Sequence, residues 1–350
     1  MFTASLAVTM LVTVLFMLAL RPMAVGLNLV DRPGGRKEHV GDVPIIVGIS
    51  MFLGVSAGLL IIPDLEFNYR YSFVASSLLV FVGLLDDRYG LQASVRLIAQ
   101  LAAVLIMVYG GGLMMRDIGD PLSIGTIYLG PFALVATALI FMAVINAFNL
   151  IDGMDGLAGS MAFVALLGIA ATSDSSSTTF AVAGITGAAV VGYLIFNFPL
   201  GRKRNYRAFM GDSGSTFLGI VIVWLTVSIC QGPQREISPV TGLWFTALPL
   251  FDLFTAFARR IVSGKSPLTS GRDHFHHMLM QAGMNVRQVL AVLVLIQLIY
   301  ASFGIAGHYG GVAEPIMFTA WAVAGISQRW VIRSCAKAYR RMSRSSGIAP

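Results

Sequence analysis

The chain has 350 residues, of which 56% are hydrophobic and only 12% are charged, with a formal net charge of +7. Its mean hydropathy of +0.79 excludes a soluble domain with a large core and predicts a polytopic membrane protein. The positive charge is spread over loop ends, as expected of cytoplasmic loops, and this pattern argues against a nucleic-acid-binding protein.

Apolar runs without Asp, Glu, Lys or Arg follow one another along the chain. They cover 3–20, 43–63, 71–85, 97–115, 121–151, 156–173, 175–201, 213–234, 237–251, 288–313 and 315–328. Short polar connectors separate them, so we predict an all-α polytopic integral membrane protein with about 11 transmembrane helices. Residues 1–350 would form a single membrane-embedded domain, with a basic cytoplasmic tail at 333–350.

Basic residues set the predicted orientation. The first run is followed by its first basic residue, Arg21, which places the N-terminus outside. If successive runs cross the membrane in opposite directions, only three of the 24 Lys and Arg residues fall on the outer side, namely Arg70, Arg116 and Arg235. The C-terminus is therefore predicted to be cytoplasmic.

Five acidic residues stand beside the inner ends of apolar runs. These residues are Asp86, Asp87, Asp152, Asp155 and Asp212. Solvated loop acids are the plain alternative, but the adjacent pair in LLDDRYG and the spacing of Asp152 and Asp155 favour a site. On a helical turn, Asp152 and Asp155 would share one face. We therefore predict that carboxylates from three loops converge at one membrane interface.

The residue types of these loops indicate a metal and a phosphate. Carboxylates with Asn oxygens and no thiolate suit Mg²⁺, or Mn²⁺, which bridges to substrate phosphates. In FMGDSGS, the glycines around Asp212 let the backbone approach a ligand, and Ser213 and Ser215 offer hydroxyls and helix-start amides to a phosphate. The alternative is that Gly-Asp-Ser forms an ordinary helix cap.

Three of the five histidines lie in KSPLTSGRDHFHHML, as His274, His276 and His277. A zinc site is one interpretation, but the neighbouring residues are mostly cationic. Donors for phosphate oxygens fit better, with Arg272 able to bind two oxygens at once. A solvated basic loop stays open as the plain alternative.

Five ordered motifs together resemble a known family. They are DRPGGRKEHVGDVP, LLDDRYG, NAFNLIDGMDGLAG, FMGDSGSTFLG and RDHFHHML, and they span roughly residues 25–285. This set resembles the polyprenyl-phosphate N-acetylhexosamine-1-phosphate transferases, and the His-x-His-His form looks closer to the WecA branch than to the MraY branch. Gly90 departs from the pattern, because relatives close to this branch often carry a third Asp there.

The resemblance implies a reaction at the cytoplasmic interface. A UDP-sugar, with UDP-N-acetylglucosamine the first choice, and undecaprenyl phosphate would give a lipid-linked diphosphate sugar and UMP, the first step of O-antigen or another cell-envelope glycan. The implied chief metal ligand is Asp212, with either Asn149 or Asp152 beside it. The implied catalytic residues are Asp86, Asp87, Asp155, His276 and His277. The implied substrate-binding residues are Lys37, His39, Asn146, Phe209, Arg272 and His274. The acceptor phosphate is already largely dianionic at neutral pH, since its second pKa is about 6, so orientation is favoured over general-base catalysis for Asp86 and Asp87.

Other functions stay open at this point. Within the family, a phospho-MurNAc-pentapeptide or deoxy-HexNAc transferase is an alternative. A membrane transporter would place its charged site at mid-membrane. The span interiors of this chain are nearly free of charge, with Asp252 the main exception, and this distribution favours an interfacial enzyme. The resemblance implies a multi-pass protein of the bacterial inner membrane, in contact with lipid and without a nucleic-acid partner. A homodimer is left open.

Overall fold

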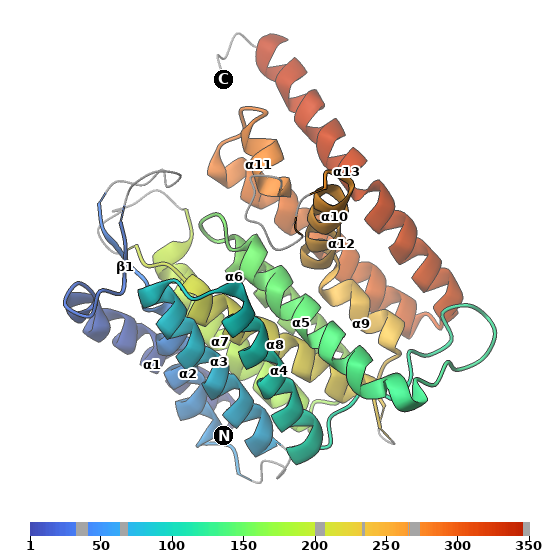
Figure 1. Ribbon diagram of the computed structural model, residues 1–350, viewed down its shortest axis with the longest axis horizontal. Helices are drawn as coiled ribbons and strands as arrows, with labels where there is room; N and C mark the ends of the chain where they lie inside the picture. Colours follow the sequence, from blue (N-terminus) through green and yellow to red (C-terminus); the bar gives the residue numbers. More distant parts are fainter. Residues whose placement is uncertain are drawn as a thin grey trace.

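A computed structural model of the protein describes residues 1–32, 41–63, 69–199, 207–232, 235–264, 266 and 274–345. The helices pack side by side, and one small sheet lies at their edge (Figure 1). The helices are α1 Phe2–Ala24, α2 Val47–Leu59, α3 Tyr69–Tyr89, α4 Ala93–Leu105, α5 Ala133–Ile151, α6 Leu157–Thr172, α7 Thr178–Asn197, α8 Gly211–Cys230, α9 Pro239–Phe245, α10 Ala247–Val262, α11 Phe275–Met280, α12 Val286–Tyr309 and α13 Glu314–Ser345, with the short helical turns η1 Ile106–Gly110 and η2 Gly130–Phe132. The one departure from an all-α fold among the described residues is the antiparallel pair β1 Val30–Asp31 and β2 Val43–Pro44.

The polytopic membrane character is confirmed. Within the described ranges, seven helices are long and apolar enough to cross a bilayer, or eight if the bent pair α9 and α10 forms one span. The predicted count of about 11 is not confirmed. The runs at 43–63 and 156–173 hold the shorter apolar helices α2 and α6, and the last run is only part of the long, mixed helix α13.

Helix α8 forms the centre of the bundle. It packs against α3 and α5 along their lengths and also contacts α2. Of its apolar window, 89% is buried, a larger share than in any other candidate span of the described chain. A side chain at Gly219 would overlap the backbone of Ile145, so this glycine lets α8 and α5 approach closely. The first turn of α8 is thereby fixed among three neighbouring helices.

A sharp break separates α9 from α10, whose axes differ by 83°. The buried side chain of Gln297 on α12 spans this break. Its Oε1 accepts a hydrogen bond from the Leu248 N–H at 2.9 Å, and its Nε2 donates to the Phe245 carbonyl at 2.8 Å. These bonds satisfy backbone groups that a continuous helix would pair by itself.

The two ends of the bundle differ in charge. The three arginines that the sequence assigned to the outer side lie at the end away from the acidic residues. Arg70 begins α3 while Asp86 ends it, and Arg235 binds Asp117 at 3.1 Å beyond the end of α8. The N–H of Arg116 donates to Gln231 at this same end.

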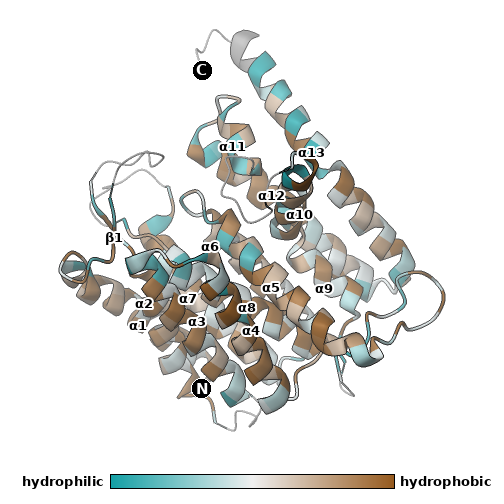
Figure 2. Cartoon of the chain, in the orientation of Figure 1, coloured by the Kyte–Doolittle hydropathy of each residue, from teal (hydrophilic) through white to brown (hydrophobic). Residues whose placement is uncertain are grey.

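Helix α13 is the longest helix of the described chain, and its upper half is hydrophilic, as is part of α11 (Figure 2). Its second half packs against α11, where Arg340 donates to the Gln281 carbonyl at 2.7 Å. Tyr339 donates to Gln288 on α12 at 3.2 Å. The basic tail thus begins as a helix that supports α11.

Candidate active site

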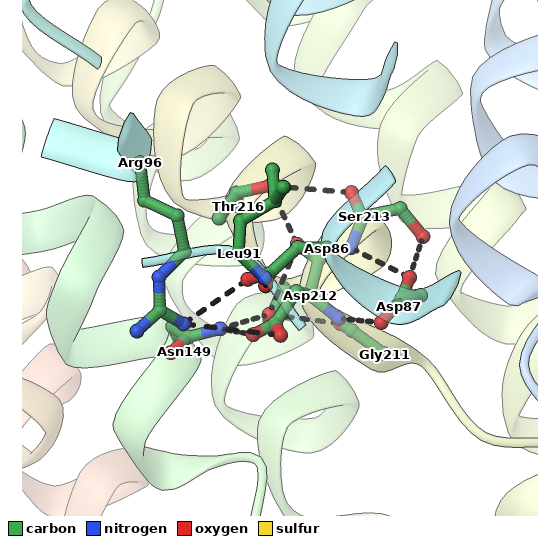
Figure 3. A network of polar contacts seen from close by, with 10 residues as sticks. Asp86, Asp87, Leu91, Arg96, Asn149, Gly211, Asp212, Ser213 and Thr216 are labelled. Carbon is green, nitrogen blue, oxygen red and sulfur yellow. Dashed lines mark hydrogen bonds and ion pairs between the residues drawn. The ribbon is translucent and has the colours of Figure 1, made fainter. Parts of the chain in front are cut away.

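Three segments that are far apart in the sequence bring acidic side chains together. Asp86 and Asp87 lie near the end of α3, Asp152 and Asp155 lie between α5 and α6, and Asp212 lies in the first turn of α8. Asp87 accepts a hydrogen bond from the Asp212 N–H, and the charges of Asp87, Asp155 and Asp212 all act on Asp152. The predicted convergence is confirmed. These five residues are termed the acidic cluster, and Figure 3 shows three of them.

The carboxylate of Asp87 holds the N-terminus of α8. It accepts from the Asp212 N–H at 2.7 Å, the Ser213 N–H at 3.1 Å and the Ser213 hydroxyl at 2.8 Å (Figure 3). N–H groups in the first turn have no partner within a helix, and a negative charge is favourable beside them. The Ser215 hydroxyl donates to the Gly211 carbonyl. In the structure, these serine groups bond to Asp87 and to the helix itself, and the phosphate cradle stays a prediction.

Glycines allow this close contact. Gly83 on α3 and Gly48 on α2 face Ser213 so closely that a side chain at either position would overlap it. Gly211 has a φ of +69°, a conformation that favours glycine, and a Cβ there would crowd the Asp87 carboxylate. These three glycines therefore allow the backbone packing around Asp87 and the start of α8.

Asp86 is buried and paired. It accepts from the Leu91 N–H at 2.6 Å and from Arg96 Nη1 at 3.1 Å. The same Nη1 atom lies 3.9 Å from Asp212 Oδ2, so one guanidinium faces two carboxylates (Figure 3). The connection between α3 and α4 that brings Arg96 back begins at Gly90, whose φ of +65° suits the glycine found there.

Asp212 does not cap its own helix. Helix α8 begins after Met210 without a side-chain cap, so the capping alternative is wrong. The Asp212 carboxylate instead accepts a hydrogen bond from Asn149 Nδ2. Asn149 also donates to Ser215 Oγ at 3.1 Å. The Asp212 side chain is 31% exposed, so this carboxylate remains accessible to a ligand.

Asp152 and Asp155 lie in a turn. Helix α5 ends at Ile151 and α6 begins at Leu157, so the prediction that the two carboxylates share a helical face is wrong. Burial, and then the negative charges of Asp212, Asp87 and Asp155, raise the pKa of Asp152 to about 8. This carboxyl group is therefore largely protonated at neutral pH in the absence of a bound cation.

A second arginine pairs with the other acid of this turn. Arg207 Nε donates to Asp155 Oδ1 at 3.1 Å, and its Nη2 contacts the second carboxylate oxygen. The guanidinium carbon lies 4.8 Å from the centre of the Phe209 ring. Phe209 is held by its N–H, which donates to the Pro44 carbonyl at 2.9 Å. Phe209, an implied substrate-binding residue, thus lies beside an Asp–Arg pair.

Asn197 at the end of α7 joins these segments. Its Oδ1 accepts from the Gly156 N–H at 2.6 Å and from the Tyr193 hydroxyl at 2.7 Å. Its Nδ2 donates to the Ala208 carbonyl at 2.9 Å. Asn197 therefore ties the turn that carries Asp155 to the segment that carries its arginine partner.

Asn146 is engaged within the protein. Its Nδ2 donates to Gln100 Oε1 on α4 at 2.8 Å and to the Met142 carbonyl at 2.7 Å. Asn146 precedes Asn149 by three residues, so the two lie on one side of α5. Its predicted contact with substrate stays a prediction.

His276 of α11 reaches the turn that carries Asp152 and Asp155. The buried ring of His276 lies so close to Gly153 that a side chain there would overlap it. Among the described residues, neither ring nitrogen of His276 has a hydrogen-bond partner. Burial, with His277 and His274 beside it, lowers the pKa of His276 to about 3, so the ring is neutral at neutral pH. The rings of His276 and His277 are 4.1 Å apart between centres.

Comparisons with known proteins agree with this arrangement. Residues 69–230 match the family model described as glycosyl transferase family 4. The undecaprenyl-phosphate alpha-N-acetylglucosaminyl 1-phosphate transferase of Yersinia pestis is 34% identical over 341 residues, which cover 95% of this chain and 93% of that protein. The protein of the same name from Escherichia coli is 33% identical, and the match covers 97% of this chain and 95% of that protein. The one from Haemophilus influenzae is also 33% identical, and the match covers 91% of this chain and 90% of that protein.

The chain belongs to this transferase family. The resemblance inferred from the five motifs is therefore confirmed, and the chain is a sugar-1-phosphate transferase. The family model covers the whole acidic cluster, while the histidines of α11 lie outside the matched segment.

Some predicted site residues of this transferase lie outside the described residues. They are Lys37, His39 and Arg272. Other residues at the site were missed from the sequence, namely Arg96, Arg207, Gln100, Asn197 and Asp252. Arg96 follows Asp86 by only ten residues across a short connection, and that spacing was a usable signal. The partners of Arg207 and Asp252 depend on tertiary contacts that no local pattern shows.

The donor set of the transferase fits a hard cation. Among the described residues, no group of three His, Cys, Asp or Glu side chains forms a metal site by itself. However, Mg²⁺ is usually bound through one or two carboxylates together with substrate phosphates. The acidic cluster has five carboxylates, and in the described chain only Arg96 and Arg207 pair with them. Burial first, and then the negative charge of the neighbouring carboxylates, raise the pKa of Asp152, and a divalent cation would offset that negative charge.

Proposed function

We propose that the protein transfers N-acetylglucosamine 1-phosphate from UDP-N-acetylglucosamine to undecaprenyl phosphate at the cytoplasmic face of the bacterial inner membrane. An oxygen of the acceptor phosphate forms a bond to the phosphorus that carries the sugar, and the bond between this phosphorus and the UMP oxygen breaks. The products are undecaprenyl-diphospho-N-acetylglucosamine and UMP. The names of the relatives support this choice of donor sugar and acceptor.

The observation that carries the proposal is the acidic cluster at the ends of α3, α5 and α8. A lipid phosphate and a water-soluble nucleotide meet only where the bilayer ends, and the carboxylates lie at helix ends. A transporter would instead need its charged site in the middle of its spans. The position of the cluster therefore supports an interfacial enzyme.

Asp212, with Asn149 or Asp152 beside it, would hold Mg²⁺ in this proposal. The ion would neutralise phosphate charge as the two anionic substrates approach. Arg96 supports this region directly, since it bridges Asp86 and Asp212 and is 37% exposed. Its position suits an oxygen of the acceptor phosphate.

Asp86 and Asp87 would orient the protein groups that bond to them rather than remove a proton from the acceptor phosphate. Their oxygens already accept hydrogen bonds from Arg96, Leu91 and the start of α8. On the donor side, the base would stack on the face of Phe209 opposite Arg207, and Asp155 would keep that guanidinium in place. His276 and His277 on α11 would contact the sugar phosphate, and His274, just before α11, would contact the sugar.

The proposed orientation places the N-terminus outside and the C-terminus in the cytoplasm. Its support is the separation of Arg70, Arg116 and Arg235 from the acidic cluster, together with the basic second half of α13. A cysteine introduced at Ser175, between α6 and α7, should react with an impermeant thiol reagent added outside intact cells. Labelling of this position only after cell disruption would invert the assignment.

The reaction is tested with purified protein in detergent. UMP release is measured with UDP-N-acetylglucosamine, UDP-N-acetylgalactosamine or UDP-glucose, each with and without undecaprenyl phosphate and Mg²⁺. We expect rapid release only with UDP-N-acetylglucosamine when both the acceptor and Mg²⁺ are present. Release that does not need the acceptor, or a clear preference for another sugar, would contradict the proposal.

A further inference from the structure

An acidic residue outside the acidic cluster contacts the histidine segment. Asp252 lies on α10, six residues after the break that separates α9 from α10, and is only 2% exposed. Its Oδ2 is 3.0 Å from His274 Nδ1, and its Oδ1 accepts from the Phe275 N–H at 3.0 Å. His274 is itself 4% exposed. One buried carboxylate thus contacts both the ring and the backbone at the start of α11.

These two contacts define the state of the histidine ring. A carboxylate only accepts hydrogen bonds, so Nδ1 of His274 carries a proton and donates it to Asp252. When the ring is neutral, its lone pair is then on Nε2, which can accept from a hydroxyl or amide N–H of a sugar. Without this partner, both tautomers of the ring would be accessible.

The backbone contact fixes the segment that follows. Helix α11 begins after His274 without a side-chain cap of its own, and Asp252 supplies an acceptor to its first N–H group from another helix. Helix α11 carries His276, which packs on Gly153 beside Asp152. The orientation of α10 is in turn set by Gln297 at the break. Asp252 therefore links this break to the histidines at the acidic cluster.

We propose that Asp252 is a positioning residue for donor binding. It holds His274 in the Nδ1-protonated tautomer, so that Nε2 is presented to the sugar-phosphate donor, and it anchors the start of α11. The functional part of this inference rests on the proposed transferase reaction. Its structural part concerns only the proton on His274.

Asp252→Asn is the most informative variant. The Asn oxygen can still accept from the Phe275 N–H, while its NH₂ group must donate to Nδ1 and thereby move the ring proton to Nε2. The side chain at position 252 keeps nearly the same volume, whereas Nε2 of His274 changes from a hydrogen-bond acceptor to a donor. We expect KM for UDP-N-acetylglucosamine to rise on the order of ten- to hundredfold, the size seen when a metal-bound histidine loses the partner that orients it, with a smaller change in kcat. Asp117→Asn, which alters a carboxylate paired with Arg235 at the far end, is the matched control and should leave KM unchanged.

Two further measurements separate positioning from general stability. If Asp252 acts through His274, adding Asp252→Asn to His274→Gln should raise KM no further. Nitrogen-15 NMR of histidine-labelled protein, with His274→Gln for assignment, should show His274 protonated at Nδ1 in the wild type and at Nε2 in Asp252→Asn. The NMR result does not depend on turnover, so it stands even if the proposed reaction fails.

The proposal is overturned if His274 is unprotonated at Nδ1 in the wild type. It is also overturned if Asp252→Asn lowers the thermal midpoint as Asp117→Asn does while KM stays at the wild-type value. Additive effects of the two substitutions on KM would contradict the link through His274.

Discussion

Replacing Asp87 with Asn should destabilise the protein. The wild-type carboxylate receives two N–H groups and one hydroxyl at the start of α8. Asn has one accepting oxygen, and its NH₂ group would face a donor. The variant therefore loses at least one of these bonds and the negative charge beside the helix N-terminus.

The size of the effect follows from these contacts. A hydrogen bond to a charged group contributes about 1.5–3 kcal/mol, and the charge at the helix terminus adds about 0.3–1 kcal/mol. Relief of repulsion with Asp212 opposes this loss, so we expect a net loss of about 1–3 kcal/mol. With an unfolding entropy of about 2.1 cal/mol/K per residue over the 350 residues, this loss lowers the thermal midpoint by roughly 1–4 °C.

The assay is thermal unfolding in detergent, with Asp212→Asn as the matched control. That variant makes the same chemical change in the same cluster, but the Asp212 carboxylate holds no helix amide. Its midpoint should be unchanged or higher, because it removes a repelling charge. A midpoint of Asp87→Asn equal to or above that of the wild type would refute the anchoring role of Asp87.

Three other substitutions test separate contacts. Asn197→Leu should raise KM for the nucleotide sugar on the order of tenfold, since it frees the turn of Asp155 from the Arg207 segment; an unchanged KM in a folded variant would argue against this. The pKa of His276 is about 3 in the folded protein and about 6.5 in the unfolded chain, so the folded protein loses about 2 kcal/mol of stability when the pH falls to 5. The thermal midpoint of His276→Gln should therefore depend less on acid pH than that of the wild type. An equal dependence would contradict the burial argument. Gln297→Leu leaves two buried backbone groups without partners and should lower the midpoint by several degrees, whereas a wild-type midpoint would show that the break needs no such bridge.

The sequence predicts the acidic cluster because each member stands at the edge of an apolar run. Membrane insertion aligns the ends of such runs, so residues as distant as Asp86 and Asp212 were expected to meet. The roles within the cluster could not be predicted in this way. Asp86 and Asp87 are neighbours in sequence, yet one pairs with Arg96 and the other holds the start of α8.

Span counting and side-chain partners depend on information that hydropathy does not contain. The run at 237–251 looks continuous, but it includes the 83° break between α9 and α10. This break is stabilised by a residue on another helix, Gln297. Likewise, Asp252 looks like a lone charge just after this run until α11 folds back and brings His274 to it.

Turnover of Asp212→Asn tests the central claim most directly. UMP release from UDP-N-acetylglucosamine and undecaprenyl phosphate is measured over a Mg²⁺ titration, beside the thermal midpoint of the same preparation. If Asp212 holds the ion at the acidic cluster, the variant should lose activity on the order of 10²- to 10³-fold or more at saturating Mg²⁺ while keeping the wild-type midpoint. Near-normal activity with an unchanged Mg²⁺ dependence would contradict the assignment of this cluster as the active site.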